Sequence, residues 1–144
     1  MLDVQRYRGA THLEEIKFAR KFMWAHMILG PVVIALFLFH EVFSWFAGST
    51  LWYTLSLAVM YGFMNERKHC RWLLALVFLG GAGAGVLFVN RVFPGIDPPR
   101  GPLIPHAFVP IWVGLANLAY TVGALFLLFN TRIRRAGQVG FTLW

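Results

Sequence analysis

Charged residues are scarce in this chain. They make up 13% of its 144 positions, whereas an average soluble domain has about 25%. Apolar residues account for 58%, and a chain this short has too little interior to hide so much apolar surface from water. The composition therefore argues against a soluble globular domain and favours a lipid bilayer as the surrounding solvent.

Cysteines and acidic residues are scarce as well. The single cysteine, Cys70, excludes an intramolecular disulfide. The six acidic residues form no pair with the spacing of a catalytic or metal site, and the sequence contains no Ser-His-Asp, Cys-His or zinc-protease pattern. We therefore do not expect this chain to be an enzyme by itself.

Basic residues are more numerous and give a net charge of +7. Nucleic-acid-binding proteins gather such residues into one patch or stripe. Here they stand in short clusters between long apolar runs, as in membrane proteins. We therefore expect no nucleic-acid partner. The expected partners are the lipid bilayer and either other membrane subunits or further copies of this chain.

Four apolar stretches reach or approach the length of about 20 residues that a membrane-spanning helix needs. The expected spans are 22–47, 50–65, 72–90 and 106–130. A tight turn at Gly48-Ser49-Thr50 is predicted to separate the first two spans. Residues 91–105 hold five of the seven prolines and are expected to form a loop outside the membrane.

These stretches predict an all-α fold, an integral membrane four-helix transmembrane bundle. Residues 1–21 are expected to form a polar N-terminal arm and the amphipathic start of the first helix, with Thr11 and Glu14 in a capping-box pattern. Residues 22–130 are the transmembrane domain. Residues 131–144 are expected to form a basic C-terminal tail.

Lysine and arginine are distributed unequally between the two sides of this bundle. Residues 1–21 carry five of them, residues 65–71 three, and the C-terminal tail three, whereas the opposite side has only Arg91 and Arg100. Loops on the cytoplasmic side carry the excess of basic residues. We therefore expect both termini on the cytoplasmic or matrix side of a bacterial cytoplasmic membrane or a mitochondrial inner membrane.

The histidines are the first candidate functional residues. His26 and His40 lie fourteen residues apart in the first span, which places them on one helix face about 21 Å apart. His69 falls on the same side of the membrane as His26, and His106 on the same side as His40. Pairs of histidines ligate b-type haem, so haem b is a candidate cofactor. The alternative is that His69 and His106 are ordinary solvated histidines at loop edges.

Two polar residues fall inside the expected spans. Glu41 lies in the outer third of the first span, where an ionised group costs at least about 2.5 kcal/mol unless it has a partner or water. It could serve a proton or cation pathway, contact a quinone or pair with Arg91; the alternative is a carboxylate near the interface that is solvated or pairs with a neighbouring subunit. Asn117 lies in the middle of the fourth span and is expected to form an interhelical hydrogen bond.

A glycine-rich segment marks the third span. No strand precedes it and no Lys-Ser or Lys-Thr follows it, so it is not a phosphate-binding loop. Gly81 and Gly85, four residues apart, form a smooth face for close helix packing. The same face could accommodate a porphyrin or quinone ring. The glycines concerned are Gly80, Gly81, Gly83 and Gly85.

Three functions are compatible with these patterns. The first, which we favour, is a non-catalytic accessory or structural subunit of a larger membrane complex, because the chain is small and 17% of it is aromatic. The second is a b-type haem-binding or quinol-reactive electron-transfer subunit that uses the four histidines. The third is a small oligomeric transporter or channel that uses Glu41.

Overall fold

The computed structural model describes residues 13–98 and 105–143. Of these residues, 88% are helical and none lies in a strand. The prediction of an all-α fold is therefore confirmed for this part of the chain. Thr11, the first part of the polar arm and the centre of the proline-rich loop lie outside the described residues.

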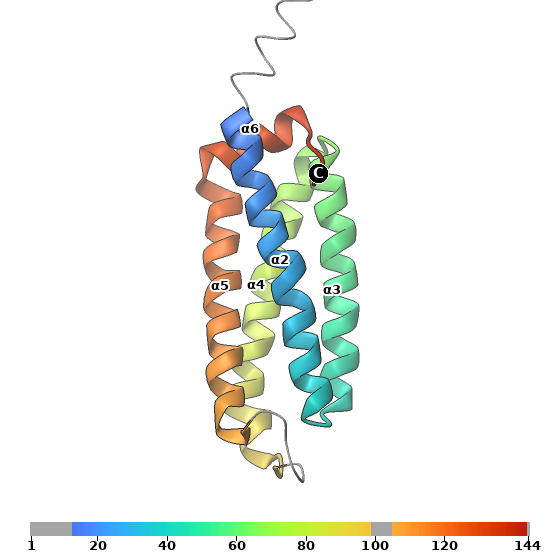
Figure 1. Cartoon of the computed structure of the whole chain (residues 1–144), viewed down its shortest axis with the longest axis vertical. Coiled ribbons are helices and arrows are strands. Elements are labelled where there is room, and N and C mark those ends of the chain that lie inside the picture. Colours follow the sequence, from blue (N-terminus) through green and yellow to red (C-terminus); the bar gives the residue numbers. More distant parts are fainter. Residues whose placement is uncertain (1–12, 99–104, 144) are drawn as a thin grey trace, which may run out of the picture.

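Four long helices lie side by side and alternate in direction (Figure 1). Each helix contacts the next one in the chain, and the last also contacts the first, so the four close into a ring. They are α2 (Leu13–Phe39), α3 (Phe43–Met64), α4 (Lys68–Leu87) and α5 (Val109–Phe129).

Short irregular helices join α4 to α5. A π-helix, η1 (Phe88–Val92), and a 3-10 helix, η2 (Phe93–Gly95), extend α4 beyond its last α-helical residue. A second 3-10 helix, η3 (His106–Phe108), leads into α5. The loop expected from residue 91 therefore starts only after Gly95, because the backbone remains helical up to that glycine.

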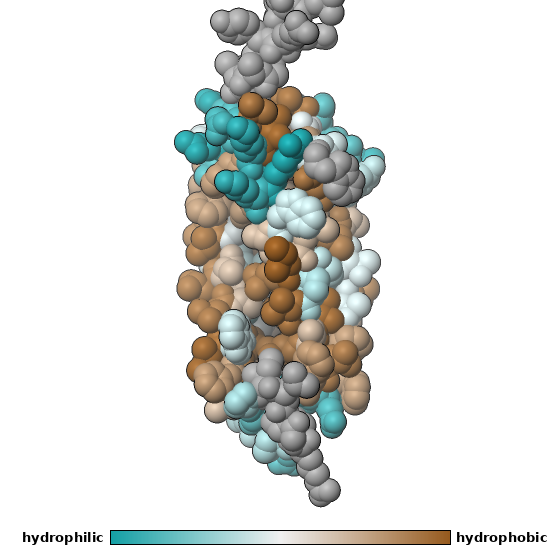
Figure 2. Space-filling model, viewed as in Figure 1, coloured by the Kyte–Doolittle hydropathy of each residue, from teal (hydrophilic) through white to brown (hydrophobic). Residues whose placement is uncertain are grey.

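Three helical segments are long and apolar enough to cross a membrane: Leu13–Phe39, Lys68–Gly95 and His106–Phe129. The helix α3 is not among them, because it carries five serine and threonine residues over its 22 positions. Large apolar side chains of all four helices are nevertheless exposed, and on the face that Figure 2 shows, apolar residues cover the middle of the molecule. An apolar surface of this kind is stable only against lipid or another protein.

The predicted turn at Gly48-Ser49-Thr50 is wrong, because α3 runs through it. The chain reverses earlier, at residues 40–42, where Glu41 adopts a positive φ of 58°. A non-glycine residue in this region does not continue a right-handed helix. The hydroxyl groups of Ser49 and Thr50 donate to the Phe46 carbonyl at 3.0 and 2.8 Å. These residues therefore satisfy their polar groups within the helix instead of ending it.

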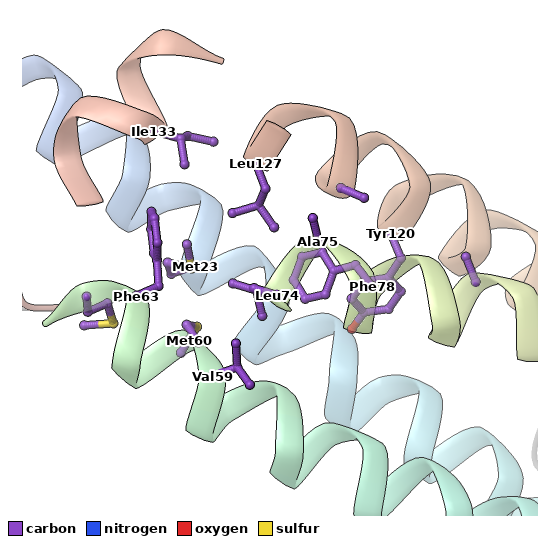
Figure 3. Packing of buried hydrophobic residues seen from close by; sticks show 13 residues of the cluster. Met23, Val59, Met60, Phe63, Leu74, Ala75, Phe78, Tyr120, Leu127 and Ile133 are labelled. Atoms are coloured by element: carbon purple, nitrogen blue, oxygen red, sulfur yellow. The ribbon is translucent and has the colours of Figure 1, made fainter. Parts of the chain in front are cut away.

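The interior contains two clusters of buried apolar side chains. The larger one lies in the half nearest the chain termini and joins all four helices, with Phe63, Phe78 and Leu127 among its members (Figure 3). The smaller one lies at the opposite end, around Phe37 and Phe88. Among the described residues, the buried polar side chains are His26, His40 and Ser56.

The expected basic tail contains a further helix, α6 (Thr131–Val139). It lies across one end of the bundle (Figure 1), with Ile133 and Ala136 fully buried and its arginines exposed. The Asn130 side chain caps it by accepting from the Arg132 and Ile133 amides at 2.9 and 3.2 Å. A side-chain cap of this kind supplies the partner that the first amides of a helix lack.

The segment after α6 ties the chain end to the start of α2. Arg20 Nε donates to the Thr142 carbonyl at 2.6 Å, and Trp24 Nε1 donates to the Leu143 carbonyl at 3.2 Å. The Phe141 amide donates to the Met64 carbonyl at 3.1 Å. The beginning of α2 and the end of the described chain therefore lie at the same end of the bundle, together with α6 and its basic residues.

Candidate functional site

His26 lies at the centre of a buried polar network. It stands on α2 with only 3% of its surface exposed. Its Nε2 lies 2.7 Å from Ser56 Oγ on α3, and its Nδ1 lies 3.1 Å from Tyr120 Oη on α5. Aromatic rings from three helices surround the imidazole, with centroid distances between 4.8 and 6.0 Å.

The hydrogen bonds determine which nitrogen of His26 carries the proton. Ser56 Oγ donates its only proton to the Tyr53 carbonyl at 2.6 Å, so it must accept the bond from His26. The imidazole therefore carries its proton on Nε2, and Nδ1 accepts from the Tyr120 hydroxyl. Both nitrogens of His26 have protein partners, and neither is free to ligate iron in this arrangement.

His69, the predicted partner of His26, lies in a different environment. It is exposed in the first turn of α4, and it is not among the ring or hydrogen-bond neighbours of His26. The structure therefore does not bring together the first of the two predicted histidine pairs. The side chains that His26 does meet, Ser56 and Tyr120, were not singled out from the sequence.

The second predicted pair is brought together. His40, at the end of α2, and His106, in η3, have ring centroids 6.1 Å apart. His40 Nδ1 donates to the Leu36 carbonyl at 3.0 Å, and His106 stacks on Phe93 with centroids 4.5 Å apart. His40 Nε2 and His106 Nδ1 are buried and have no hydrogen-bond partner among residues 13–98 and 105–143. The two neighbouring imidazoles therefore each retain one nitrogen for a small bound group or water.

Glu41 occupies a different place from the one expected. It is exposed, and it lies in the turn between α2 and α3 at the end of the bundle instead of inside a span. Among the described residues, no ion pair joins it to Arg91. An exposed carboxylate at the end of the bundle can be solvated, so its position does not require the partner that an intramembrane carboxylate would need.

The four glycines of α4 divide into two groups. A Cβ added at Gly81 would lie 2.6 Å from the Trp52 indole, and one added at Gly85 would overlap the Asn117 amide. At Gly80 and Gly83 an added Cβ would meet nothing within 4 Å. The close packing expected of this segment is therefore carried by Gly81 and Gly85, which lie one helical turn apart.

Asn117 lies against this glycine face from α5. Both atoms of its amide are satisfied when the oxygen accepts from the Val86 amide at 3.2 Å and the nitrogen donates to the Val113 carbonyl at 3.3 Å. In that orientation Asn117 forms the interhelical hydrogen bond that its place in the fourth span predicts. Gly85 leaves the room for it, since any side chain at that position would occupy the same space.

A pocket of about 360 Å³ lies beside the glycine face. Its walls are mainly aromatic and small side chains, and Trp52 is fixed by a bond from Nε1 to the Val77 carbonyl at 2.8 Å. Tyr120, the hydroxyl partner of His26, also lines it. The lining includes residues of all four long helices: Val33, Phe37, Trp45, Trp52, Gly81, Ala84, Gly85, Val113, Asn117 and Tyr120.

This pocket can hold a flat or flexible apolar molecule. Its polar lining residues are few, and two of them, Ser49 and Asn117, already bond within the protein. The sequence analysis singled out the glycines that line this pocket but not its aromatic residues, Trp45 and Trp52 among them. The available signal was the spacing of Trp45 and Trp52, since residues seven apart lie on the same face of a helix.

No protein-family model matches this chain, and no curated protein and no solved structure matches it either. The buried network, the histidine pair and the pocket are therefore the features from which a function can be argued.

Proposed function

We propose that this chain is an integral membrane four-helix bundle that serves as a non-catalytic subunit of a larger membrane complex. Both termini lie on the cytoplasmic or matrix side of a bacterial cytoplasmic or mitochondrial inner membrane. Support comes from three helical segments that are apolar enough to span a bilayer. The concentration of basic residues at the end that holds both described termini supports the orientation.

The main support for the subunit assignment is the outward face of α3. Four small or hydroxyl-bearing residues lie exposed along it at spacings of three and four, which places them on one side of the helix. Helices in membranes approach each other closely along faces of small residues. These residues are Ala47, Thr50, Thr54 and Ala58.

Two further features fit a protein partner at this face. The hydroxyls of Thr50 and Thr54 donate to backbone carbonyls of α3 at 2.8 and 2.9 Å, so another helix can cover them without leaving a donor unsatisfied. Large aliphatic side chains are exposed on both helices: Leu51 and Leu55 of α3 are 73% and 53% exposed, and Leu115 and Leu118 of α5 are 52% and 63% exposed. The outward face of α5 differs in that none of its exposed residues is a serine or threonine. A face of that kind suits lipid chains.

A photo-crosslinking experiment in the native membrane tests this assignment. A photoreactive amino acid is placed at Thr54 on α3 and, as the matched control, at Leu118 on α5. We expect Thr54 to give one discrete protein adduct, either a partner subunit or a second copy of the chain, and Leu118 to give lipid adducts only. Lipid adducts alone from both positions, together with a monomeric chain in mild detergent, would contradict the subunit role.

A quinol-reactive subunit is the second candidate, favoured by the pocket beside the glycine face. Tyr120 lines that pocket, and its hydroxyl bonds to His26. Because its proton is donated to His26, the Tyr120 hydroxyl oxygen can accept a hydrogen bond from the hydroxyl of a bound quinol. A b-type haem version of this function would rely on His40 and His106, because both nitrogens of His26 are already bonded.

The quinone candidate has a direct binding test. Trp52 lines the pocket, so a bound quinone analogue should quench tryptophan emission of the detergent-solubilised protein. Gly80→Leu should weaken this quenching at least about tenfold, because it places a side chain in the pocket where an added Cβ meets no atom. Gly83→Leu, on the open face of the same helix, is the control. Equal quenching in all three proteins would remove the candidate.

A further inference from the structure

A second, smaller cleft lies at the basic end of the bundle. Its volume is about 170 Å³, and it lies where the start of α4 meets α3 and α6. Four cationic side chains line it, together with Phe63, Trp72, Gly137 and Gln138. The cationic residues are Arg67, Lys68, Arg71 and Arg134.

No carboxylate neutralises these four charges within the described residues. The two ion pairs found there join Lys17 to Glu14 and Arg135 to Glu15, and neither includes a residue of the cleft. One guanidinium nitrogen of Arg71, Nη1, is buried and has no hydrogen-bond acceptor in the described part of the chain. The charges of Arg71 and Arg134 also repel each other.

An anion bound between these side chains would remove two destabilising effects: the missing acceptor for Arg71 Nη1 and the repulsion between Arg71 and Arg134. A buried guanidinium nitrogen without an acceptor loses the hydrogen bond it had in water. Like charges in proximity destabilise each other unless a counter-charge lies between them. Arginine binds phosphate with two parallel hydrogen bonds, which makes phosphate the anion that best suits a cleft lined by three arginines.

The start of α4 adds to the positive potential of the cleft. Arg67 is the N-cap residue of this 20-residue helix, and its side chain forms no capping bond. The first amides of a helix carry a partial positive charge and lack intrahelical partners. Phosphate groups bind readily at such helix ends, so the helix and the arginines favour the same class of ligand.

We propose that this cleft binds the phosphate headgroup of an anionic phospholipid. The inference rests on the proposed membrane location. The cleft lies at the end of α4 where the exposed Trp72 marks an interface, and Arg71 lies 5.2 Å from its ring centroid. Leu73 and Leu76, 48% and 64% exposed, continue along α4 from the cleft. A lipid can therefore place its phosphate in the cleft and its acyl chains along this helix, which a free phosphate ion cannot do.

The test compares lipids and variants on the full chain in mild detergent. We expect the purified protein to retain about one anionic phospholipid per chain in native mass spectrometry, as one cleft predicts. Added phosphatidylglycerol should raise the midpoint of thermal unfolding, whereas phosphatidylcholine should not. The double variant Arg71→Gln/Arg134→Gln should bind phosphatidylglycerol roughly 10–100-fold more weakly.

Three controls separate this inference from simpler explanations. The variant Lys21→Gln/Arg132→Gln removes the same charge from the same end of the bundle, outside the cleft, and should retain the lipid. An equal loss in both double variants would overturn the proposal, because it would indicate general charge attraction. Stabilisation by inorganic phosphate equal to that by phosphatidylglycerol would also overturn it. If a variant does not fold, the wild-type protein alone tests the proposal: stabilisation by phosphatidylglycerol but not by phosphatidylcholine supports it, and equal stabilisation by both lipids overturns it.

The membrane location is checked separately by extracting native membranes at alkaline pH. A chain that leaves the membrane contradicts the proposed function itself. A chain that remains inserted but shows no preference for phosphatidylglycerol contradicts only the lipid site.

Discussion

His26→Ala is expected to lower the free energy of unfolding by about 3 kcal/mol. The substitution leaves a cavity among the aromatic rings that surround the imidazole. It also removes the acceptor of the Tyr120 hydroxyl and the donor to Ser56, both of which are buried. Replacement water is poorly accommodated there, because apolar rings line the space.

Unfolding in detergent micelles, followed by tryptophan emission, measures this loss. The ring centroid of Trp52 lies 6.0 Å from that of His26, so its emission should report the change locally. His69→Ala removes an exposed histidine at the start of α4 and should change stability by less than about 0.5 kcal/mol. Equal effects of the two substitutions would contradict the buried network.

Tyr120→Phe tests the coupling within the network. Alone it should cost about 1 kcal/mol, since it removes one hydrogen bond and little volume. Combined with His26→Ala it should add less than that, because the hydroxyl has already lost its partner. Full additivity would show that the hydrogen bond between Tyr120 and His26 does not contribute to stability.

Gly81→Ala is expected to destabilise the protein by about 2 kcal/mol. The new Cβ would lie 2.6 Å from the Trp52 indole. The indole cannot move away freely, because its Nε1 donates to the Val77 carbonyl at 2.8 Å and its ring packs in a T-shaped contact with Tyr120, with centroids 4.9 Å apart. Relief of the clash therefore requires loss of that bond or separation of α3 from α4.

Gly83→Ala is the matched control for this prediction. Both glycines lie in α4 two residues apart, but an added Cβ at Gly83 meets nothing within 4 Å. Alanine there should leave stability unchanged or raise it by up to about 1 kcal/mol, because glycine is the poorer helix former. Thermal unfolding of both variants in the same detergent compares them. A loss at Gly83 as large as that at Gly81 would contradict the packing described for the α3–α4 interface.

The sequence was a good guide to properties that depend on single side chains. The all-helical class and the apolar stretches around α2, α4 and α5 were predicted, because hydropathy needs no knowledge of neighbours. The amphipathic α6 was missed, although Ile133 and Ala136, three apart between arginines, carried a readable signal. The regular spacing of its buried residues could have predicted it.

The turn at Gly48-Ser49-Thr50 illustrates where sequence reasoning went wrong. Glycine, serine and threonine end many helices in water, because their backbone and hydroxyl groups have alternative partners there. Within α3, Ser49 and Thr50 bond to the Phe46 carbonyl instead. The real reversal is at Glu41, a residue type that rarely adopts a positive φ, so no local pattern predicted it.

The sequence by itself determined that the chain is helical, strongly apolar and basic at one end, since each of these follows from residue type and order along the chain. Only the tertiary structure decided which polar groups meet. His26 bonds Ser56 and Tyr120, which are 30 and 94 residues away. His40 faces His106, and Arg71 approaches Arg134 across α4 and α6. Such pairings depend on how the helices rotate and pack against each other, and helix rotation is set by side-chain fit across interfaces that local periodicity does not encode.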